Sequence, residues 1–331
     1  MRTKSDGTPA VLYPKAALEP ESADAFADLV RDEGARRLWM GQSLGIDPHH
    51  VFTRLSATGR SVACGTSVTL TSLRHPYEAA IQARSVAAMT GHPFVGGFGP
   101  GSPRFVSALR GAGFESPLTA MREYLDIVGR LLRGEQVRTQ GRYYALSAGL
   151  LPMETSGIEV GAGVLREGMA RVTGETADVA ITWMTPRSYV AEKLVPALEE
   201  GRERAERENG PRVATVVHVA VDRPHRDPYQ LALAGAGAHL SMGHYTDMLG
   251  RAGVPADPND PAAGARALVD HGVFVTGSPA EIAAELQRYR ESGVDEVILN
   301  CGSVAFTEGE EAALTDLREI LRAVGGVRES R

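Results

Sequence analysis

Short apolar runs alternate with longer stretches of helical periodicity along almost the whole chain. The runs are rich in β-branched and other apolar residues and are bounded by turn residues, a pattern typical of buried strands. The predicted strands are Ala10–Tyr13, Arg37–Gln42, Ser61–Ser67, Phe94–Phe98, Ile158–Gly161, Asp178–Trp183, Val213–Val221 and Glu296–Asn300. The predicted helices cover residues 22–34, 48–59, 75–90, 117–133, 165–176, 187–208, 228–250 (as one helix or two) and 279–292.

The strict alternation of strand and helix predicts a parallel sheet with right-handed crossovers. Helix boundaries are well marked: Pro48 and Pro76 stand in first turns, Gly91 closes a helix, and Ser278 with Glu281 predicts a capping box. Eight repeats favour a (β/α)8 TIM barrel of the α/β class, with an open doubly wound sheet as the alternative. We expect residues 1–8 to be a disordered tail and residues 9–331 to form a single domain.

Two insertion segments interrupt the alternation. Residues 136–151 contain a turn before an aromatic run, which predicts a β-hairpin. Residues 252–264 are rich in Pro, Asp and Ala and are interpreted as an ordered loop or a lid. Neither segment is long enough to separate two domains.

Composition narrows the class of protein. The chain has 331 residues, a net charge of −6 and a pI near 5.9, which argue against a nucleic-acid or anionic-membrane partner. No membrane-spanning or signal-peptide run stands out, and the two cysteines, Cys64 and Cys301, suggest reduced, buried thiols of a cytoplasmic protein. No motif has the spacing of a metal site. Lysine occurs only at positions 4, 15 and 193, an arginine preference that suggests a high-GC genome such as that of an actinomycete.

Small, backbone-exposing residues follow two of the predicted strands. Gly65-Thr66-Ser67-Val68 ends the third strand, and the fourth continues into Gly99-Pro100-Gly101-Ser102. In a barrel, ligands bind at the carboxyl ends of the strands, and glycine-rich loops expose N–H groups there. These ends suggest a planar ring beside one strand terminus and an anionic group near another, although a plain strand-to-loop transition explains the first motif equally well.

The fifth strand leads directly into a helix through Gly161-Ala162-Gly163-Val164-Leu165-Arg166. Amide groups at a helix N-terminus, together with Arg166, predict an anion site. A surface ion pair between Arg166 and Glu167 is the alternative interpretation.

Few residues are suited to proton transfer. Gln42 and Ser43 end the second strand, and His218 lies on a strand face that points either into the barrel or into a satisfied core. His239 and His244 can reach a substrate or lie on the surface. Because no nucleophile elbow, carboxylate pair or zinc motif is present, we expect a bound cofactor to supply the chemistry.

The chain resembles the bacterial luciferase-like superfamily and, within it, the enzymes that use the deazaflavin coenzyme F420. The resemblance is carried by Leu38–Gly41, Gly65–Val68, Leu73–Pro76, Gly97–Gly101, Gly174–Asp178, Tyr189–Glu200 and Gly293–Val297. It implies a cis peptide bond between Ser67 and Val68 that supports the deazaflavin ring. It also implies that the Gly99–Ser102 loop borders the ring, that residues 161–166 bind the cofactor phosphate, and that the protein is a homodimer.

The chain departs from relatives at several site positions. Gln42-Ser43 stands where relatives place Asp-His or another acid/base pair, Ser102 replaces a glutamate of the sugar-phosphate dehydrogenases, and Ala87 replaces an aspartate. Val164-Leu165 replaces a Gly-Gly pair of the phosphate loop. Without a strong base, reduction of an activated double bond is easier to support than alcohol oxidation, with water, His218 or Ser43 delivering the proton.

The resemblance therefore implies an F420-dependent oxidoreductase that acts on a small-molecule or modified-peptide substrate. Dehydroalanine in lanthipeptide natural-product biosynthesis is one such substrate. Two alternatives remain: a monooxygenase that uses FMN supplied in reduced form by a partner reductase, and a catalytically silent homologue that binds a cofactor.

Overall fold

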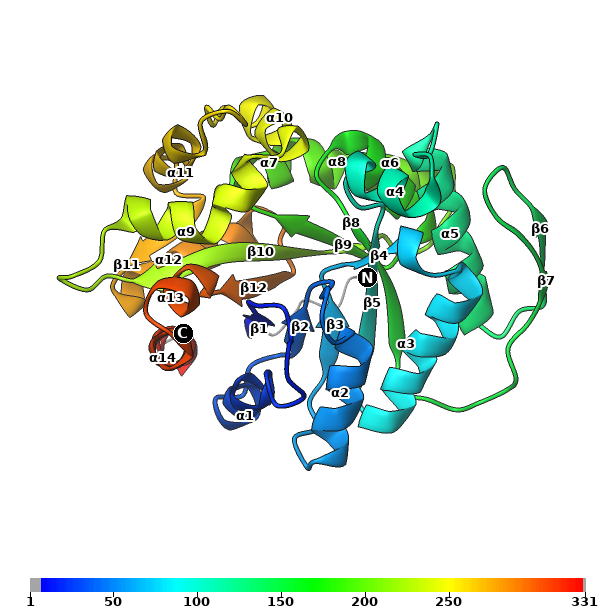
Figure 1. Cartoon of the computed structure of the whole chain (residues 1–331), viewed down its shortest axis with the longest axis horizontal. Coiled ribbons are helices and arrows are strands. Elements are labelled where there is room, and N and C mark those ends of the chain that lie inside the picture. Colours follow the sequence, from blue (N-terminus) through cyan, green and yellow to red (C-terminus); the bar gives the residue numbers. More distant parts are fainter. Residues whose placement is uncertain (1–6, 330–331) are drawn as a thin grey trace.

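Eight parallel strands close into a ring in the computed structural model, which describes residues 7–329 (Figure 1). Strand pairing runs β1-β2-β3-β5-β8-β9-β10-β12, and β12 pairs back with β1 through Val11 and Leu299. The ring strands are β1 (Ala10–Tyr13), β2 (Leu38–Met40), β3 (Cys64–Thr66), β5 (Phe94–Gly99), β8 (Ile158–Gly163), β9 (Val179–Trp183), β10 (Arg212–Val221) and β12 (Glu296–Asn300). The (β/α)8 barrel is confirmed, and the open doubly wound sheet is wrong because no edge is left between β1 and β12.

The ring strands are the eight that the sequence predicts, but three are shorter: β9 by one residue, and β2 and β3 by more. β2 and β3 end at Met40 and Thr66, so Gln42 and Ser67 lie beyond the ladder at the carboxyl rim. Two short strands were not predicted: β4 (Thr69–Leu70), which pairs with β5, and β11 (Phe274–Gly277), which pairs with the end of β10. The strand–helix alternation does not predict β11 because this strand lies outside the closed ring.

Helices follow most strands and cover the ring. They are α1 (Asp24–Asp32), α2 (Pro48–Ala57), α3 (Pro76–Thr90), α4 (Pro103–Arg110), α5 (Pro117–Leu132), α6 (Glu167–Thr176), α7 (Arg187–Tyr189), α8 (Val195–Arg204), α9 (Pro228–Leu240), α10 (Gly243–Arg251), α11 (Pro261–Asp270), α12 (Pro279–Glu291), α13 (Gly302–Thr307) and α14 (Glu310–Glu329). A 3-10 turn, η1 (Thr71–Leu73), precedes α3, and a π-helical turn, η2 (Val190–Leu194), joins α7 to α8.

One segment needs correction among the helix predictions. The capping box at Ser278 is present, and residues 228–250, expected as one helix or two, form two helices, α9 and α10. The expectation of a loop at 252–264 is wrong for its last residues, because α11 begins at Pro261. The Asp260 side chain accepts the Ala263 N–H and caps this helix. Of the expected tail, residues 1–6 lie outside the described residues.

The predicted hairpin is confirmed and lies away from the barrel ends. β6 (Val137–Gln140) and β7 (Ala145–Ala148) pair antiparallel beyond α5, at the edge of the molecule in Figure 1. The Glu123 carboxylate on α5 accepts the N–H groups of Arg142, Tyr143 and Tyr144 at 2.8–3.1 Å. The Glu123 carboxylate thus anchors the turn of the β6–β7 hairpin to α5.

Charged side chains close the amino end of the barrel. Glu296, whose side chain is fully buried, accepts the Trp39 Nε1–H and the Arg212 Nη1–H, each at 2.8 Å. Arg37 Nε lies 3.2 Å from the same carboxylate, and Arg212 also bonds both oxygens of Glu159. A buried charge is stable only when it is paired and hydrogen-bonded, as this network provides.

Two other observations bear on the class of protein. Among residues 7–329, no helix combines the length and the apolar character needed to cross a membrane. Cys64 and Cys301 are both buried and free of disulfide bonds.

Candidate active site at the carboxyl rim

The carboxyl end of the barrel interior has two unlike halves. Side chains of a strand alternate between its two faces, so every second residue points into the barrel. On three strands the inward positions reach the carboxyl end as glycine: Trp39 is followed by Gly41, Val95 by Gly97 and Gly99, and Gly161 by Gly163. On the opposite side the same face ends in bulky polar residues: Trp183 on β9, His218 on β10 and Asn300 on β12. On the glycine side the strand ends approach one another closely, since a Cβ on Gly97, Gly99 or Gly161 would lie less than 3 Å from protein atoms, whereas the other side supplies side-chain hydrogen-bonding groups.

Val68 joins three strand ends within the glycine-lined half. A Cβ placed on Gly99 would lie 2.6 Å from Val68 Cγ2, and one on Gly163 would lie 3.6 Å from both Val68 methyl groups. The Ser67–Val68 peptide bond is cis, as the resemblance implies. The predicted residues Ser67, Val68, Gly99 and Gly163 are therefore brought together.

Hydroxyl and amide groups hold this segment in place. The Thr66 and Thr69 hydroxyls both donate to the Gly97 carbonyl, at 3.0 and 3.1 Å. Gln42 Oε1 accepts the Leu70 N–H at 3.3 Å, while its backbone N–H donates to the Val68 carbonyl. Gln42 therefore fixes the position of the segment on which Val68 stands.

The Ser43 side chain serves the neighbouring loop. Its hydroxyl accepts the Gly45 N–H at 2.9 Å and donates to the Ala17 carbonyl at 3.4 Å. Both the Gln42 and the Ser43 side chains are hydrogen-bonded to backbone groups. The catalytic role that the sequence suggests for these two residues remains a prediction.

An ion-pair cluster braces the loops that follow β2 and β3. The Asp47 carboxylate caps α2 by accepting the His49 N–H, lies 2.7 Å from His49 Nδ1 and pairs with Arg74 at 2.6 Å. Burial opposes the charge on Asp47, but the His49 hydrogen bonds and the positive charge of Arg74 outweigh it and lower the pKa of Asp47 to about 2.

The loop after β5 turns at Gly101 and starts a helix. Gly101 has a φ of +78°, a conformation that favours glycine, and Pro100 precedes it at the rim. The Ser102 hydroxyl accepts the Phe105 N–H at 3.3 Å and so caps α4. Ser102 therefore caps a helix within the loop that is expected to border the ring, and its contact with a cofactor remains a prediction.

The side chains of residues 161–166, the predicted phosphate-binding segment, point in different directions. Ala162 and Val164 point into buried clusters behind the rim, so only their backbone groups can serve a ligand, whereas Gly163 faces inward and Leu165 is partly buried. Arg166 is the N-cap residue of α6 and pairs with Asp247 of α10 at 3.2 Å, rather than with Glu167, which accepts the Tyr189 hydroxyl. The Arg166 side chain does not cap α6, so the N–H groups of the first turn receive no acceptor from the N-cap side chain.

His218 is buried, neutral and incompletely bonded. Burial, reinforced by the nearby His239, lowers the pKa of His218 to about 3. Its Nδ1 lies 3.4 Å from Asn300 Nδ2, and within residues 7–329 its Nε2 has no hydrogen-bond partner. At neutral pH this side chain is therefore an uncharged imidazole.

Trp183 and His239 complete the polar half of the rim. The Trp183 ring centroid lies 5.7 Å from that of His218 and 5.1 Å from that of His239. Trp183 Nε1 and His239 Nδ1 are also buried without a partner in the described part of the chain. Burial and His244 lower the pKa of His239 to about 4. Trp183 and Asn300 were not predicted as site residues, although each ends a predicted strand on the same face as Ile181 or Ile298.

Apolar side chains are exposed around the opening. Leu18, Leu44 and Phe306 are 75%, 81% and 53% exposed, on the segments that follow β1, β2 and β12. Because these segments leave the carboxyl ends of the strands, they flank the barrel opening with apolar surface.

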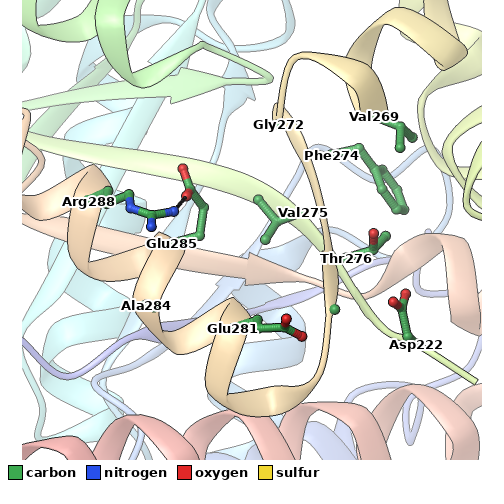
Figure 2. A pocket seen from close by; sticks show the side chains of 11 residues that line it. Asp222, Val269, Gly272, Phe274, Val275, Thr276, Glu281, Ala284, Glu285 and Arg288 are labelled. Carbon is green, nitrogen blue, oxygen red and sulfur yellow. Dashed lines mark hydrogen bonds and ion pairs between the residues drawn. The ribbon is translucent and has the colours of Figure 1, made fainter.

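A separate hollow of about 500 Å³ lies outside the ring, between β11 and α12 (Figure 2). Glu285 and Arg288 pair on its wall, and Phe274 contributes one edge while also stacking on His218. None of the predicted site residues lines this hollow, and among the residues described no cluster of His, Cys, Asp and Glu could hold a metal ion.

Comparison with known proteins identifies a matching family and several similar proteins. The profile of the luciferase-like monooxygenase family matches residues 6–296. The 5,10-methylenetetrahydromethanopterin reductase of Methanolobus tindarius is 24% identical over 89% of this chain and 94% of its own. The coenzyme F420-dependent tetrahydromethanopterin reductase of Methanopyrus kandleri has the same fold, with a TM-score of 0.74 at 19% identity over 98% of this chain and 99% of its own. An FMN-bound type II Baeyer–Villiger monooxygenase of Pseudomonas putida gives a TM-score of 0.70 at 14% identity, over 98% of this chain and 99% of its own.

Proposed function

This chain belongs to the luciferase-like monooxygenase family, and we propose that within it the protein is a coenzyme F420-dependent oxidoreductase that reduces an activated double bond. The observation that carries the proposal is the asymmetry of the rim. A backbone-lined half around Val68, Gly99 and Gly163 faces a half with unsatisfied side-chain donors. Relatives that use F420 support this choice of cofactor.

The residues at the rim fit a deazaflavin. Val68, whose methyl groups pack against Gly99 and Gly163, would support one face of the ring. Arg166 and the uncapped N–H groups of α6 would hold the phosphate. When bound in its reduced form, the deazaflavin supplies a hydride.

The protein side chains favour reduction over oxidation. Oxidising an alcohol requires a base to remove the hydroxyl proton, and His218 is held neutral among buried rings with Asn300 at its Nδ1. Reducing a polarised double bond requires only a hydride, a proton from water and groups that stabilise the developing charge. The polar half of the rim supplies groups of that last kind.

The opening suits a substrate with an apolar portion. Leu18, Leu44 and Phe306 would contact the part of the substrate that remains outside the ring. Dehydroalanine within a modified peptide is a candidate, because its double bond is conjugated to a carbonyl and the peptide extends beyond the site.

The test is a reaction of the purified chain with reduced F420 and a panel of cyclic enones and dehydroamino-acid esters. We expect formation of oxidised F420, followed by its absorbance, in step with loss of the double bond. Oxygen consumption with reduced FMN, and no interaction with F420, would instead establish the monooxygenase alternative. Tight F420 binding without turnover on any panel member would indicate the silent homologue.

A further inference from the structure

The hydrogen-bond pattern around His218 defines its tautomer. Asn300 Oδ1 accepts the Gly302 N–H at 2.8 Å, so the Asn300 amide is oriented with its Nδ2 donor toward His218. His218 Nδ1 must therefore accept, and in a neutral imidazole the proton then resides on Nε2. The unpartnered nitrogen of His218 is a hydrogen-bond donor.

Trp183 presents a second donor of the same kind beside it. Indole Nε1–H can only donate, and among the described residues it has no acceptor. Its ring meets the His218 ring edge-on, at 84° and 5.7 Å between centroids. A buried donor without an acceptor costs about 1–3 kcal/mol, so two such donors on neighbouring rings indicate a ligand that supplies an acceptor.

Both donors are neutral, and this limits the acceptor. A carboxylate or phosphate buried here would need a cation for compensation, whereas a carbonyl oxygen needs only donors. The Phe274 ring, stacked at 21° and 6.1 Å, covers one face of His218. These donors therefore suit an uncharged oxygen whose negative charge grows during the reaction.

We propose that the substrate carries a carbonyl group conjugated to the double bond, and that His218 Nε2–H and Trp183 Nε1–H bind the carbonyl oxygen. This inference rests on the proposed function. Reduced deazaflavin, when bound, would supply the hydride for a C–H bond at the β-carbon, and the electron pair of the double bond would move to the carbonyl oxygen held by the two donors. Water would then protonate the α-carbon, and the hydroxide left would take the N–H proton that the deazaflavin gives up on oxidation, so the substrate would gain two electrons and the deazaflavin lose two.

The chain provides its own internal control for a binding test. It has two tryptophans, Trp39 and Trp183, and the Trp39 indole N–H is already bonded to Glu296 at the opposite end of the barrel. Titration with cyclohex-2-enone is followed by the indole N–H signals in a 15N-correlated NMR spectrum. The Trp183 signal, assigned from W183F, should move downfield while the Trp39 signal stays in place. Cyclohexene, which has no oxygen, should leave both signals in place.

The matched variants are W183F and H218F, which keep an aromatic ring and remove the N–H donor. We expect each to lower kcat/KM for cyclohex-2-enone at least about tenfold with unchanged F420 affinity. H225F, at an exposed histidine paired with Glu308, should behave as wild type. Nothing in the titration requires the cofactor.

An unmoved Trp183 signal, an equal shift with cyclohexene, or full enone reduction by both variants would overturn the carbonyl subsite and leave the proposed function standing. A shifted Trp183 signal in a protein that does not interact with F420 would leave the subsite standing and overturn the proposed function.

Discussion

At the residue scale, burial decides what each rim side chain can do. The sequence leaves open whether His218 points into the barrel or into a satisfied core, and the structure places it beside Asn300 and Trp183 at the rim. The proton-donor role suggested for it remains a prediction, and burial among aromatic rings favours the uncharged imidazole. Spacing alone predicts the direction of a side chain but carries no information about its solvation.

The neutral state of His218 predicts loss of stability in mild acid. Its pKa falls from about 6.5 in the unfolded chain to about 3 in the fold, so below pH 6.5 the unfolded state binds more protons. Between pH 7 and pH 5 this one group should lower the free energy of unfolding by about 2 kcal/mol. Urea unfolding at both pH values measures the difference. H218F should show a smaller dependence on pH, and an unchanged slope would contradict the assignment.

The backbone-lined half predicts that one methyl group disturbs cofactor binding. In G99A the new Cβ would lie 2.6 Å from Val68 Cγ2, forcing Val68 out of place. We expect F420 affinity to fall about tenfold or more and stability to fall by about 1–3 kcal/mol. The control is G157A, where a Cβ meets no atom within 4 Å. Binding titrations of the two variants separate the effects, and equal F420 affinity in both would count against the site.

At the element scale, the eight ring strands could be predicted because each is a short buried run bounded by glycine or polar residues. β11 was missed because it pairs only with the far end of β10 and adds nothing to the alternation. The Gly99–Ser102 loop follows β5, and Ser102 caps α4 there, a role that depends on that helix; contact of the loop with a cofactor remains a prediction. Trp183 and Asn300 were overlooked because their importance arises from strands far apart in sequence meeting at one rim.

The charged layer at the amino end predicts a large stability effect far from the site. In E296Q, Arg37 and Arg212 lose the fully buried carboxylate that they share. We expect the free energy of unfolding to fall by about 3–5 kcal/mol. In E33Q the lost partner is Arg322, which is 70% exposed, so that change should cost less than about 1 kcal/mol. Denaturant unfolding measures the free energy of unfolding of both variants. A similar decrease in E296Q and E33Q would show that the buried ion pairs of Glu296 stabilise the fold no more than a surface pair does.

At the scale of the whole molecule, the barrel separates stability from function. The amino end is closed by ion pairs around Glu296, whereas the carboxyl end combines glycines, unsatisfied donors and exposed apolar residues. The division was predictable in outline, since a (β/α)8 barrel places ligands at the carboxyl rim. Homodimer formation remains a prediction, which sedimentation equilibrium of the purified chain tests directly.

The central claim is that this rim directs a hydride from a deazaflavin onto carbon. The most direct measurement supplies reduced F420 carrying deuterium at its hydride-donating carbon, together with cyclohex-2-enone, and locates the isotope by mass spectrometry and NMR. We predict cyclohexanone with one deuterium at the β-carbon. Product free of deuterium, or a product that carries oxygen from O2 when reduced FMN is supplied instead, would contradict this account.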